Sequence, residues 1–369
     1  MTGTRPAEAA IAAPATRREG PAASAPAPDA AYRALVRRRL GWLGCGLGAF
    51  VALAVGDVVT GPSALGFAEV AQTLLAPGEA SPMARVILFD IRLPITLMAV
   101  LVGMALGMAG VHMQTILGNP LASPYTLGFS AAAGFGAALV ILTGLSLPFL
   151  PWLTIPLAAF TMCLLAGAIV FFFARMQGMS PEVMVLAGIA TLFMFQAAQS
   201  FVQYLASPEV LQAIVFWLFG SLLRASWANV PIVAGVVALG TLAVLPDLWR
   251  LTALRLGGGR AEAIGVDLQA LRIRIFAVVA LLTTGAVAFV GTIGFVGLVA
   301  PHIARMAVGE DQRLLLPMAA LTGANIMLGA SVLSKTLAPG AVIPIGIVTA
   351  VIGVPFLFLL ILRGQRRHW

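Results

Sequence analysis

Long apolar runs recur along almost the whole sequence, and their length constrains the fold more than any other feature. A helix crosses a bilayer core about 30 Å thick with roughly 20 apolar residues. Strands of a membrane barrel would instead alternate polar and apolar residues over about ten positions. We therefore expect an all-α polytopic membrane protein of about ten helices, near residues 40–59, 93–116, 124–143, 151–174, 182–205, 228–248, 271–290, 292–308, 312–334 and 345–362.

The composition agrees with a membrane protein, because only 10% of the 369 residues are charged and 60% are hydrophobic. A soluble domain carries about 25% charged residues. Residues 1–34 differ, since they are rich in Ala, Pro and Arg and offer no apolar face. We expect them to form a disordered cytoplasmic tail ahead of one transmembrane domain, residues 35–369. A cleaved signal peptide is the alternative, but its apolar region would begin unusually late.

The basic residues predict the orientation. The cluster Arg37–Arg39 precedes the first apolar run, and the positive-inside rule places such a cluster in the cytoplasm. Ten alternating helices then put both termini and 18 of the 22 basic residues inside. The four that remain outside are Arg85, Arg92, Arg224 and Lys335. Orientation thus accounts for the net charge of +8, and no nucleic-acid partner is expected.

The acidic residues argue against ion-coupled transport. All 14 fall in the tail, in loops or near predicted helix ends. Proton- or sodium-coupled carriers usually place ionisable groups or broken-helix ion sites near the midplane. The segment Gly329–Thr336 resembles a phosphate loop but has Ser334 where the second glycine belongs. The energy for transport therefore comes from another chain, unless the protein is a passive channel.

Catalytic and metal-binding residues are not expected in this chain. It has three histidines, His112, His302 and His368, and it lacks the HExxH pattern and paired carboxylates on one helix face. We predict no metal site and no cofactor bound by this chain. A membrane enzyme is the third class of function, and it would need a catalytic cluster that these residues do not suggest.

Glycines recur at spacings that bring helices together. Two of them are four residues apart and three others recur every third residue: Gly103, Gly107, Gly291, Gly294 and Gly297. Small residues on one face let helix backbones approach closely in lipid. We expect all five to be helix-packing sites, the last three on a short, crowded helix that leaves the membrane at the inner face.

Several longer motifs occur together in one order. They are Arg92-Leu-Pro94, the stretch from Gln114 through Asn119-Pro120 to Gly128, Phe216-Trp217-Leu-Phe-Gly220-Ser221, Glu262-Ala-Ile-Gly265-Val266, the stretch from Gly291 to Arg305, and Pro344-Ile-Gly346-Ile-Val-Thr349. In these motifs the chain resembles the permease family of bacterial binding-protein-dependent ABC importers for iron chelates, haem and cobalamin, which have the type II importer fold. The resemblance covers about residues 40–363.

This resemblance implies a ten-helix subunit in the bacterial inner membrane that works as a dimer, which we take as a homodimer. It also implies two separate ATP-binding cassette subunits, which bind ATP and Mg²⁺, and a periplasmic substrate-binding protein. The chain itself would then be no enzyme, because its partners hydrolyse ATP.

The resemblance also assigns residues to contacts with these partners. The cytoplasmic residues that match the ATPase-coupling segment are Glu262, Ala263, Ile264, Gly265 and Val266. Arg92 matches a basic position that docks the binding protein, with Lys335 and Arg224 as further candidates. Ile95 stands where the family often has a second basic residue. The alternatives are a solvated loop near anionic lipid head groups, and cations that merely reach the membrane interface.

A gate is expected near the inner face. The residues that we assign to the gate and pathway are Asn119, Pro120, Leu121, Ala122 and Ser130, and the helix near 182–205 resembles the opposite wall. The alternative is that Asn119-Pro120 is simply a turn. His112 is unusual for the family, and we expect it to form a hydrogen bond with a neighbouring helix.

These observations predict a permease subunit that moves an iron chelate, a ferric siderophore first and haem second, from periplasm to cytoplasm by alternating access. Cobalamin import is the alternative within the family, and a passive channel is the alternative from another class. The sequence does not select the ligand, because the translocation surface is expected to be apolar while the binding protein selects the cargo.

Overall fold

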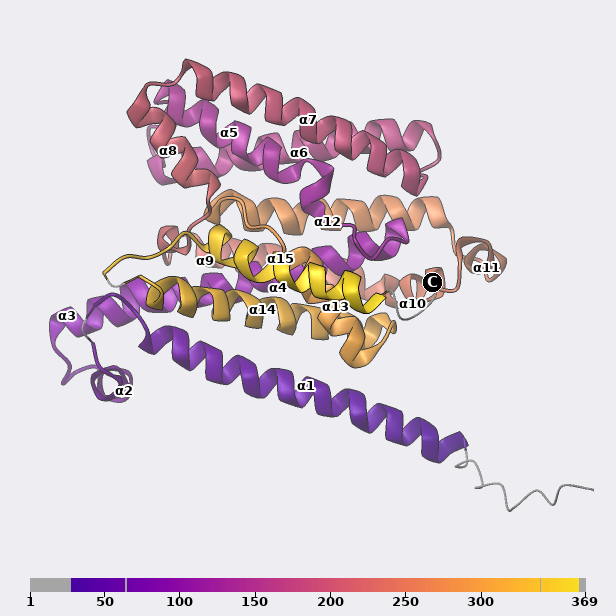
Figure 1. The fold of residues 1–369 in the computed structure, drawn as a ribbon, viewed down its shortest axis with the longest axis horizontal. Helices are drawn as coiled ribbons and strands as arrows, with labels where there is room; N and C mark the ends of the chain where they lie inside the picture. The colour runs from indigo at the N-terminus through magenta and orange to yellow at the C-terminus, as the bar shows by residue number, and fades with distance from the viewer. Residues whose placement is uncertain (1–27, 64, 339, 365–369) are drawn as a thin grey trace, which may run out of the picture.

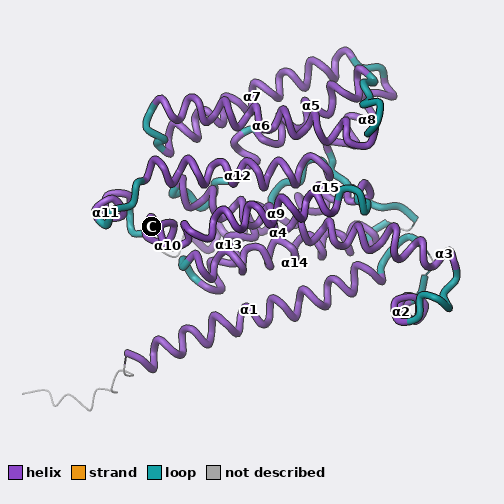
Figure 2. The backbone as a smooth tube through the Cα atoms, turned by 180° about the vertical axis from the view of Figure 1, so that it is seen from behind, coloured by secondary structure: helices purple, strands orange, loops and turns teal. Residues whose placement is uncertain are grey.

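The computed structural model describes residues 28–63, 65–338 and 340–364, and all regular structure within them is helical (Figure 1, Figure 2). The α-helices are α1 (Pro28–Val59), α2 (Phe67–Leu75), α3 (Pro82–Arg85), α4 (Leu93–Leu117), α5 (Phe129–Thr143), α6 (Thr154–Met176), α7 (Pro181–Leu205), α8 (Pro208–Leu218), α9 (Val230–Val244), α10 (Leu248–Leu254), α11 (Gly258–Ala263), α12 (Leu268–Val290), α13 (Val296–Val308), α14 (Gln312–Thr336) and α15 (Ile345–Gly364). Shorter elements are the π-helix η1 (Val86–Arg92) and the 3₁₀ turns η2 (Pro124–Leu127), η3 (Pro151–Leu153), η4 (Leu222–Arg224) and η5 (Leu245–Asp247).

The long helices lie side by side in three groups (Figure 1, Figure 2). Helices α5 to α8 form one edge of the bundle, α1 forms the opposite edge, and α4, α9 and α12 to α15 lie between them. Burial follows this order, because 78% of the most apolar stretch of α12 is buried but only 11% of that of α1. The apolar surface of α1 is therefore available to contact lipid, and a helix in contact with lipid needs no polar face.

Seven helical segments in the described residues are long and apolar enough to cross a membrane. The ten predicted runs all fall on helices, but α5 and α13 are shorter than predicted, and α9 reaches its predicted length only together with η5 and α10. Helix α5 has 15 residues and α13 has 13, which correspond to about 22 Å and 20 Å of rise. Gly128 and Gly144, both with positive φ, bound α5. The all-α membrane fold is confirmed, and these shorter helices pack within it.

The start of α1 corrects one prediction. Residues 1–27 of the expected tail lie outside the described residues, but 28–34 form the first turns of α1 instead of tail. Pro28 occupies the first helical position, where its missing N–H costs nothing. Ala30, Ala31 and Ala34 follow, and Ala has the highest helix propensity of the ordinary residues. Propensity therefore extends the helix beyond its apolar stretch.

In the bundle centre, α4 and α14 touch backbone to backbone. A Cβ added at Gly103 would collide with the carbonyl of Gly323, and one added at Gly107 would collide with the carbonyl of Ala319. Both predicted packing glycines therefore lie where two backbones touch. This contact holds α4 and α14 as one unit.

The glycines before α13 correct a second prediction. Helix α13 begins at Val296, so Gly291 and Gly294 lie in a non-helical link and not on a helix face. Gly291 ends α12 with φ +82°, and a Cβ at Gly294 would meet nothing within 4 Å. Phe295 has φ +68°, a conformation that stops a right-handed helix. Of these three glycines, only Gly297 lies within a helix. A Cβ added at Gly297 would lie 3.2 Å from the Leu106 carbonyl oxygen of α4.

Candidate functional site: an apolar cavity and two polar ends

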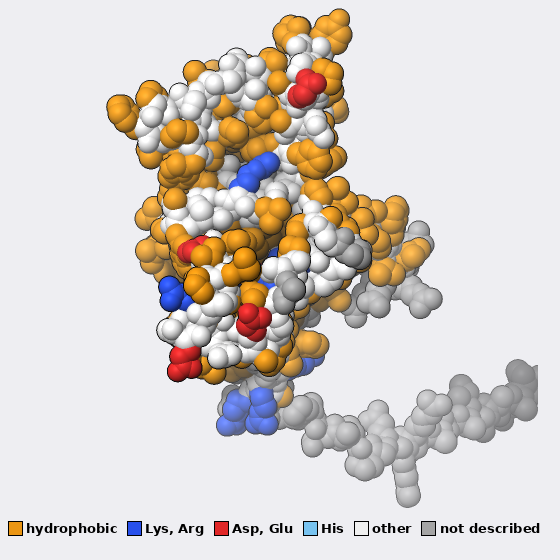
Figure 3. Space-filling view, turned by 90° about the vertical axis from the view of Figure 1, so that its left-hand side faces the viewer, with side chains coloured by type: hydrophobic (Ala, Val, Ile, Leu, Met, Phe, Trp, Pro, Cys, Tyr) orange, Lys and Arg blue, Asp and Glu red, His pale blue; other side chains and the backbone are white. Residues whose placement is uncertain are grey.

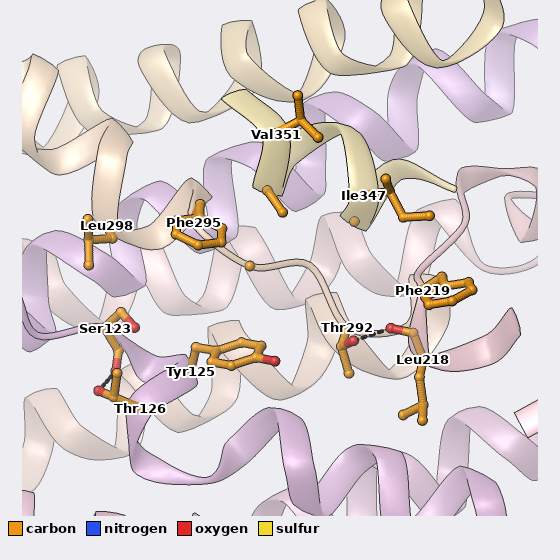
Figure 4. A pocket seen from close by; sticks show the side chains of 13 residues that line it. Ser123, Tyr125, Thr126, Leu218, Phe219, Thr292, Phe295, Leu298, Ile347 and Val351 are labelled. Carbon is orange, nitrogen blue, oxygen red and sulfur yellow. Dashed lines mark hydrogen bonds between the residues drawn. The ribbon is translucent and has the colours of Figure 1, made fainter. Parts of the chain in front are cut away.

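A cavity of about 650 Å³ opens between η2, the end of α8, the link before α13, and α15 (Figure 4). Its walls include Tyr125, Phe219, Phe295, Leu298 and Val351. This volume lies in the range of small-molecule sites, about 300–1000 Å³. The elements that form it are irregular or short because glycines and prolines interrupt them, and this leaves a hollow between the longer helices.

Two of the four hydroxyl groups that line the cavity are used by the protein itself. The Thr292 hydroxyl donates to the Leu218 carbonyl, and the Thr126 hydroxyl donates to the Ser123 carbonyl at 2.7 Å. The Tyr125 side chain points across the cavity toward Thr292 (Figure 4). The wall therefore offers large apolar surfaces and few fixed hydrogen-bonding groups.

Phe295 is held in a strained conformation on this wall. Its φ of +68° is uncommon for a residue with a side chain and costs of order 1–3 kcal/mol. A Cβ at Gly353 of α15 would collide with the Phe295 side chain, so the α15 glycine makes room for the ring. Sequence patterns do not reveal this wall, because the residues before α13 are as apolar as a helix.

The predicted gate residues lie beside the cavity. Helix α4 ends at Gly118 with φ +60°, and the Asn119 side chain accepts a hydrogen bond from the Leu121 N–H at 2.9 Å. Pro120 lies in the same turn. Leu121 is 60% exposed. The chain then continues into η2, so the turn connects the end of α4 to the cavity wall. Sequence reasoning included this turn through Ser123 but gave no pathway role to Tyr125, which lines the cavity with Ser123.

Two further pathway residues are buried. Ala122 is 5% exposed, and Ser130, in the first turn of α5, is 3% exposed. Ser130 borders a small hollow next to the main cavity, together with Ser123 and Leu298. It therefore lies behind the cavity wall and not on its open surface.

The predicted coupling segment projects from one end of the molecule (Figure 1). Ala261 and Val266 are buried at its base. The N–H of Val266 donates to the Ala261 carbonyl at 3.0 Å, and the turn is completed by Gly265 with φ +86°. The residues between these anchors, Glu262, Ala263 and Ile264, are exposed, and Ile264 is an apolar side chain with 57% exposure. The structure thus presents a fixed turn with an apolar tip.

The opposite end corrects the placement of two predicted docking residues. Arg92 and Lys335 were expected on the outer surface, but Arg92 is 3% exposed and the Lys335 side chain is 5% exposed. The Arg92 guanidinium donates to the carbonyls of Val58 and Val59 at 2.9 Å and 2.6 Å, and also to Ser63. The end of α1 carries partial negative charge, which attracts this cation.

Lys335 is buried against an acid that the sequence placed only near a helix end. Its ammonium lies 2.8 Å from the Asp57 carboxylate, and the Thr96 hydroxyl donates to the same carboxylate at 2.6 Å. Asp57 is 0% exposed. These contacts join α1, α4 and α14. Lys335 also lies in the continuous helix α14, so the segment that resembles a phosphate loop has no free loop backbone to bind a phosphate.

Arg224 is the predicted docking residue that remains exposed. It lies in η4, and its guanidinium is 5.8 Å from the centroid of the Trp217 ring. Burial of part of the side chain lowers the pKa of Arg224 from its ordinary value. Figure 3 views this end of the molecule, where the charged side chains on the visible face are scattered and do not form a continuous charged patch. Its docking role stays a prediction.

Two of the three histidines, His112 and His302, lie in the described residues. His112 is 1% exposed within α4, and its Nδ1 has no hydrogen-bond partner among the described residues. The hydrogen bond expected between His112 and a neighbouring helix is therefore not made by Nδ1. In the part of the chain that the structure describes, no three His, Cys, Asp or Glu side chains are grouped so that they would hold a metal ion.

In the part of the chain that the structure describes, an all-helical bundle with seven segments long and apolar enough to cross a membrane indicates a multi-pass membrane protein. The chain belongs to the FecCD transport family, whose model matches residues 49–363. The coupling, gate and cavity residues described above all fall within this match.

Relatives with different cargoes in their names are about equally similar to this chain. The hemin transport system permease protein of Yersinia pestis is 36% identical and aligns over 76% of this chain and 84% of its own length. The vitamin B12 import system permease protein of Vibrio vulnificus is 34% identical over 81% of this chain and 90% of its own. The Fe(3+)-citrate import system permease protein of Bacillus subtilis is 35% identical over 76% and 83%.

A solved structure has the same fold. It is described as a metal-chelate type ABC transporter in an inward-facing conformation, and it superposes with a TM-score of 0.76 at 31% identity. The match covers 87% of this chain and 98% of that one.

Proposed function

We propose that this chain is the membrane subunit of an ATP-driven importer that moves a bulky iron chelate, a ferric siderophore first and haem second, from periplasm to cytoplasm. The observation that carries the proposal is the apolar cavity of about 650 Å³. Because most of its wall is apolar and two of its four hydroxyls are paired within the protein, the cavity makes few demands on the polar groups of a ligand. Such a wall suits a permease whose cargo is selected by another protein.

In this proposal two copies of the chain face each other to form a homodimer. The cavity is bordered by α15, where Val351 is 67% exposed and Ile347 is 39% exposed. Two cavities that meet across these helices would form one pathway with twice the volume. The turn after α4 then closes its cytoplasmic side, and alternating access opens each side in turn.

The two ends of the molecule suit different partners. The turn around Ile264 offers an apolar tip on a buried base, which fits a cleft in each of two ATP-binding cassette subunits. Those subunits bind ATP and Mg²⁺. The opposite end, with Arg224 exposed, receives the periplasmic binding protein, and charge pairs there steer its encounter. In this proposal the complex lies in the bacterial inner membrane.

Uptake into liposomes tests the proposal. The chain is reconstituted with its ATPase, with and without the binding protein, and supplied with a ferric siderophore, haem or cobalamin. ATP-dependent uptake of the siderophore that vanadate stops is the expected result. Selective uptake of haem or cobalamin would correct the cargo. Flux that is indifferent to the ATPase would overturn the mechanism in favour of a channel.

A further inference from the structure

A cluster of polar side chains lies at the α11 end of the bundle, where α10, α4 and the α13–α14 turn meet. We call it the polar relay, and it consists of Gln114, Thr115, Arg255, Arg305, Glu310 and Gln312. Both glutamines are 0% exposed. The cavity, the exposed coupling turn and the outer ion pair do not include any of these residues.

One chain of contacts runs from α10 to α4 through a carboxylate. Arg255, at the end of α10, donates to Glu310 in the α13–α14 turn at 2.8 Å. Glu310 also accepts from Nε of Arg305 on α13 at 3.0 Å. Arg305 in turn donates through Nη1 to the Gln114 side chain on α4 at 2.9 Å. Charge-assisted bonds of this kind are shorter and stronger than neutral ones.

A second chain joins the same two helices. The Gln312 N–H donates to the Thr252 hydroxyl of α10 at 3.1 Å, and the Gln312 side-chain amide donates to the Thr115 hydroxyl of α4 at 3.0 Å. The α13–α14 turn is therefore held between α10 and α4 by two parallel connections. Such a double connection resists sliding of one helix past the other better than a single contact.

The two ends of the relay are attached to the moving parts of the proposed transporter. Arg255 lies three residues before α11, which carries the coupling turn. At the other end, the Gln114 carbonyl accepts the N–H of Asn119 at 3.2 Å, in the turn assigned to the gate. Contiguous hydrogen bonds therefore join the residues before α11 to the gate turn, and packed hydrogen-bond networks of this kind are one route by which coupling is carried.

The relay also holds unused hydrogen-bonding capacity. Gln114 Nε2, Arg255 Nε, Arg305 Nη2 and Gln312 Oε1 are buried and have no hydrogen-bond partner among the described residues. Such orphaned groups are uncommon in folded proteins. Three are donors and one is an acceptor, so the same side chains have the means to form other pairs when the helices shift.

We propose that Arg255, Glu310 and Arg305 are positioning residues that transmit movement of α11 to the gate turn, by exchanging hydrogen bonds within the relay. This inference rests on the proposed function. The competing explanation is that these contacts only hold the fold, as many buried polar networks do.

The test is Glu310→Gln in the complete complex, because it keeps the side-chain shape and removes the charge that joins the two arginines. The expected result is ATP hydrolysis within about twofold of the parent with uptake lowered about tenfold, a range typical of coupling energies. Arg274→Gln is the matched control, since it breaks the 3.2 Å pair between Arg274 and Asp247, which does not reach α4. Its ratio of hydrolysis to uptake should not change.

A second measurement separates transmission from stability. Leu121→Cys places a thiol on the exposed gate turn, and its labelling rate should change on ATP binding in the parent but not with Glu310→Gln. If hydrolysis, uptake and thermal stability instead fall together, the relay is only structural. If the complex with Glu310→Gln fails to assemble, Arg255→Lys is used in its place. It keeps the positive charge but loses the planar guanidinium, so uptake should fall while ATP hydrolysis stays near the parent level.

The outcomes for the two proposals are distinct. Absence of ATP-driven uptake in the parent contradicts the proposed function. A second outcome is that the parent complex shows normal ATP-driven uptake while Glu310→Gln keeps the parent's ratio of hydrolysis to uptake and the parent's labelling response. That result contradicts the proposed relay and leaves the proposed function standing.

Discussion

The ion pair between Asp57 and Lys335 predicts a large effect of Lys335→Met. The carboxylate is 0% exposed and the lysine side chain 5% exposed, so methionine leaves a buried charge whose one remaining side-chain hydrogen bond comes from Thr96. Removal of one partner from such a pair costs about 3–5 kcal/mol. At this chain length that corresponds to a Tm lowered by about 4–6 °C.

The assay is thermal unfolding of the purified complex in detergent, and size-exclusion chromatography measures how much intact complex remains at each temperature. Lys335→Met is compared with the double variant Asp57→Asn and Lys335→Met, which removes both charges. The double variant should recover most of the lost stability, because it no longer buries an unpaired charge. Such recovery would be specific to the pair, since two independent substitutions would add their losses.

The sequence-based docking assignment makes the opposite prediction for Lys335. If Lys335→Met leaves Tm unchanged and weakens only the affinity for the binding protein, the ammonium contacts that partner and our account of the buried pair is wrong.

Three further predictions address packing, coupling and assembly. Gly107→Val should lower the thermal stability by about 1–3 kcal/mol or more, because its side chain would displace the α14 backbone, whereas Gly294→Ala should leave the thermal stability nearly unchanged. Ile264→Asp should abolish copurification with the ATPase while the permease stays folded by circular dichroism, and copurification at the parent level would contradict the docking of this turn. Val351→Cys, with both native cysteines replaced, should form a disulfide-linked dimer on mild oxidation in membranes, and a monomer after oxidation would contradict pairing through α15.

Run length and spacing predicted most of the fold. Twenty apolar residues admit few structures in lipid, so the helices fall where the runs do. Hydropathy fails at the link Gly291–Phe295, because its residues are as apolar as those of α13 and the positive φ values at Gly291 and Phe295 are what interrupt the helix. It also fails at residues 28–34, where helix propensity extends α1 beyond its long apolar run.

The candidate site was predicted less completely, for a physical reason. Short turns such as Gly118–Ser123 and Glu262–Val266 reveal themselves locally through glycine and proline. Long-range pairs do not: Asp57 and Lys335 are 278 positions apart, and Arg305 and Gln114 are 191 apart. From the sequence, the charged residues of these pairs are expected to face solvent, because each of them lies near a predicted helix end.

Helix α4 connects these observations. Near its outer end, Thr96 binds the buried acid of α1; at its centre, Gly103 and Gly107 touch the backbone of α14; in its last turn, Gln114 joins the polar relay. A helix held at three levels cannot bend easily, so force applied at the relay moves α4 as a rod or is absorbed at the first flexible point beyond it. That point is Gly118, whose left-handed φ of +60° ends the helix and begins the gate turn. Rigidity of α4 therefore concentrates movement in the segment that borders the cavity.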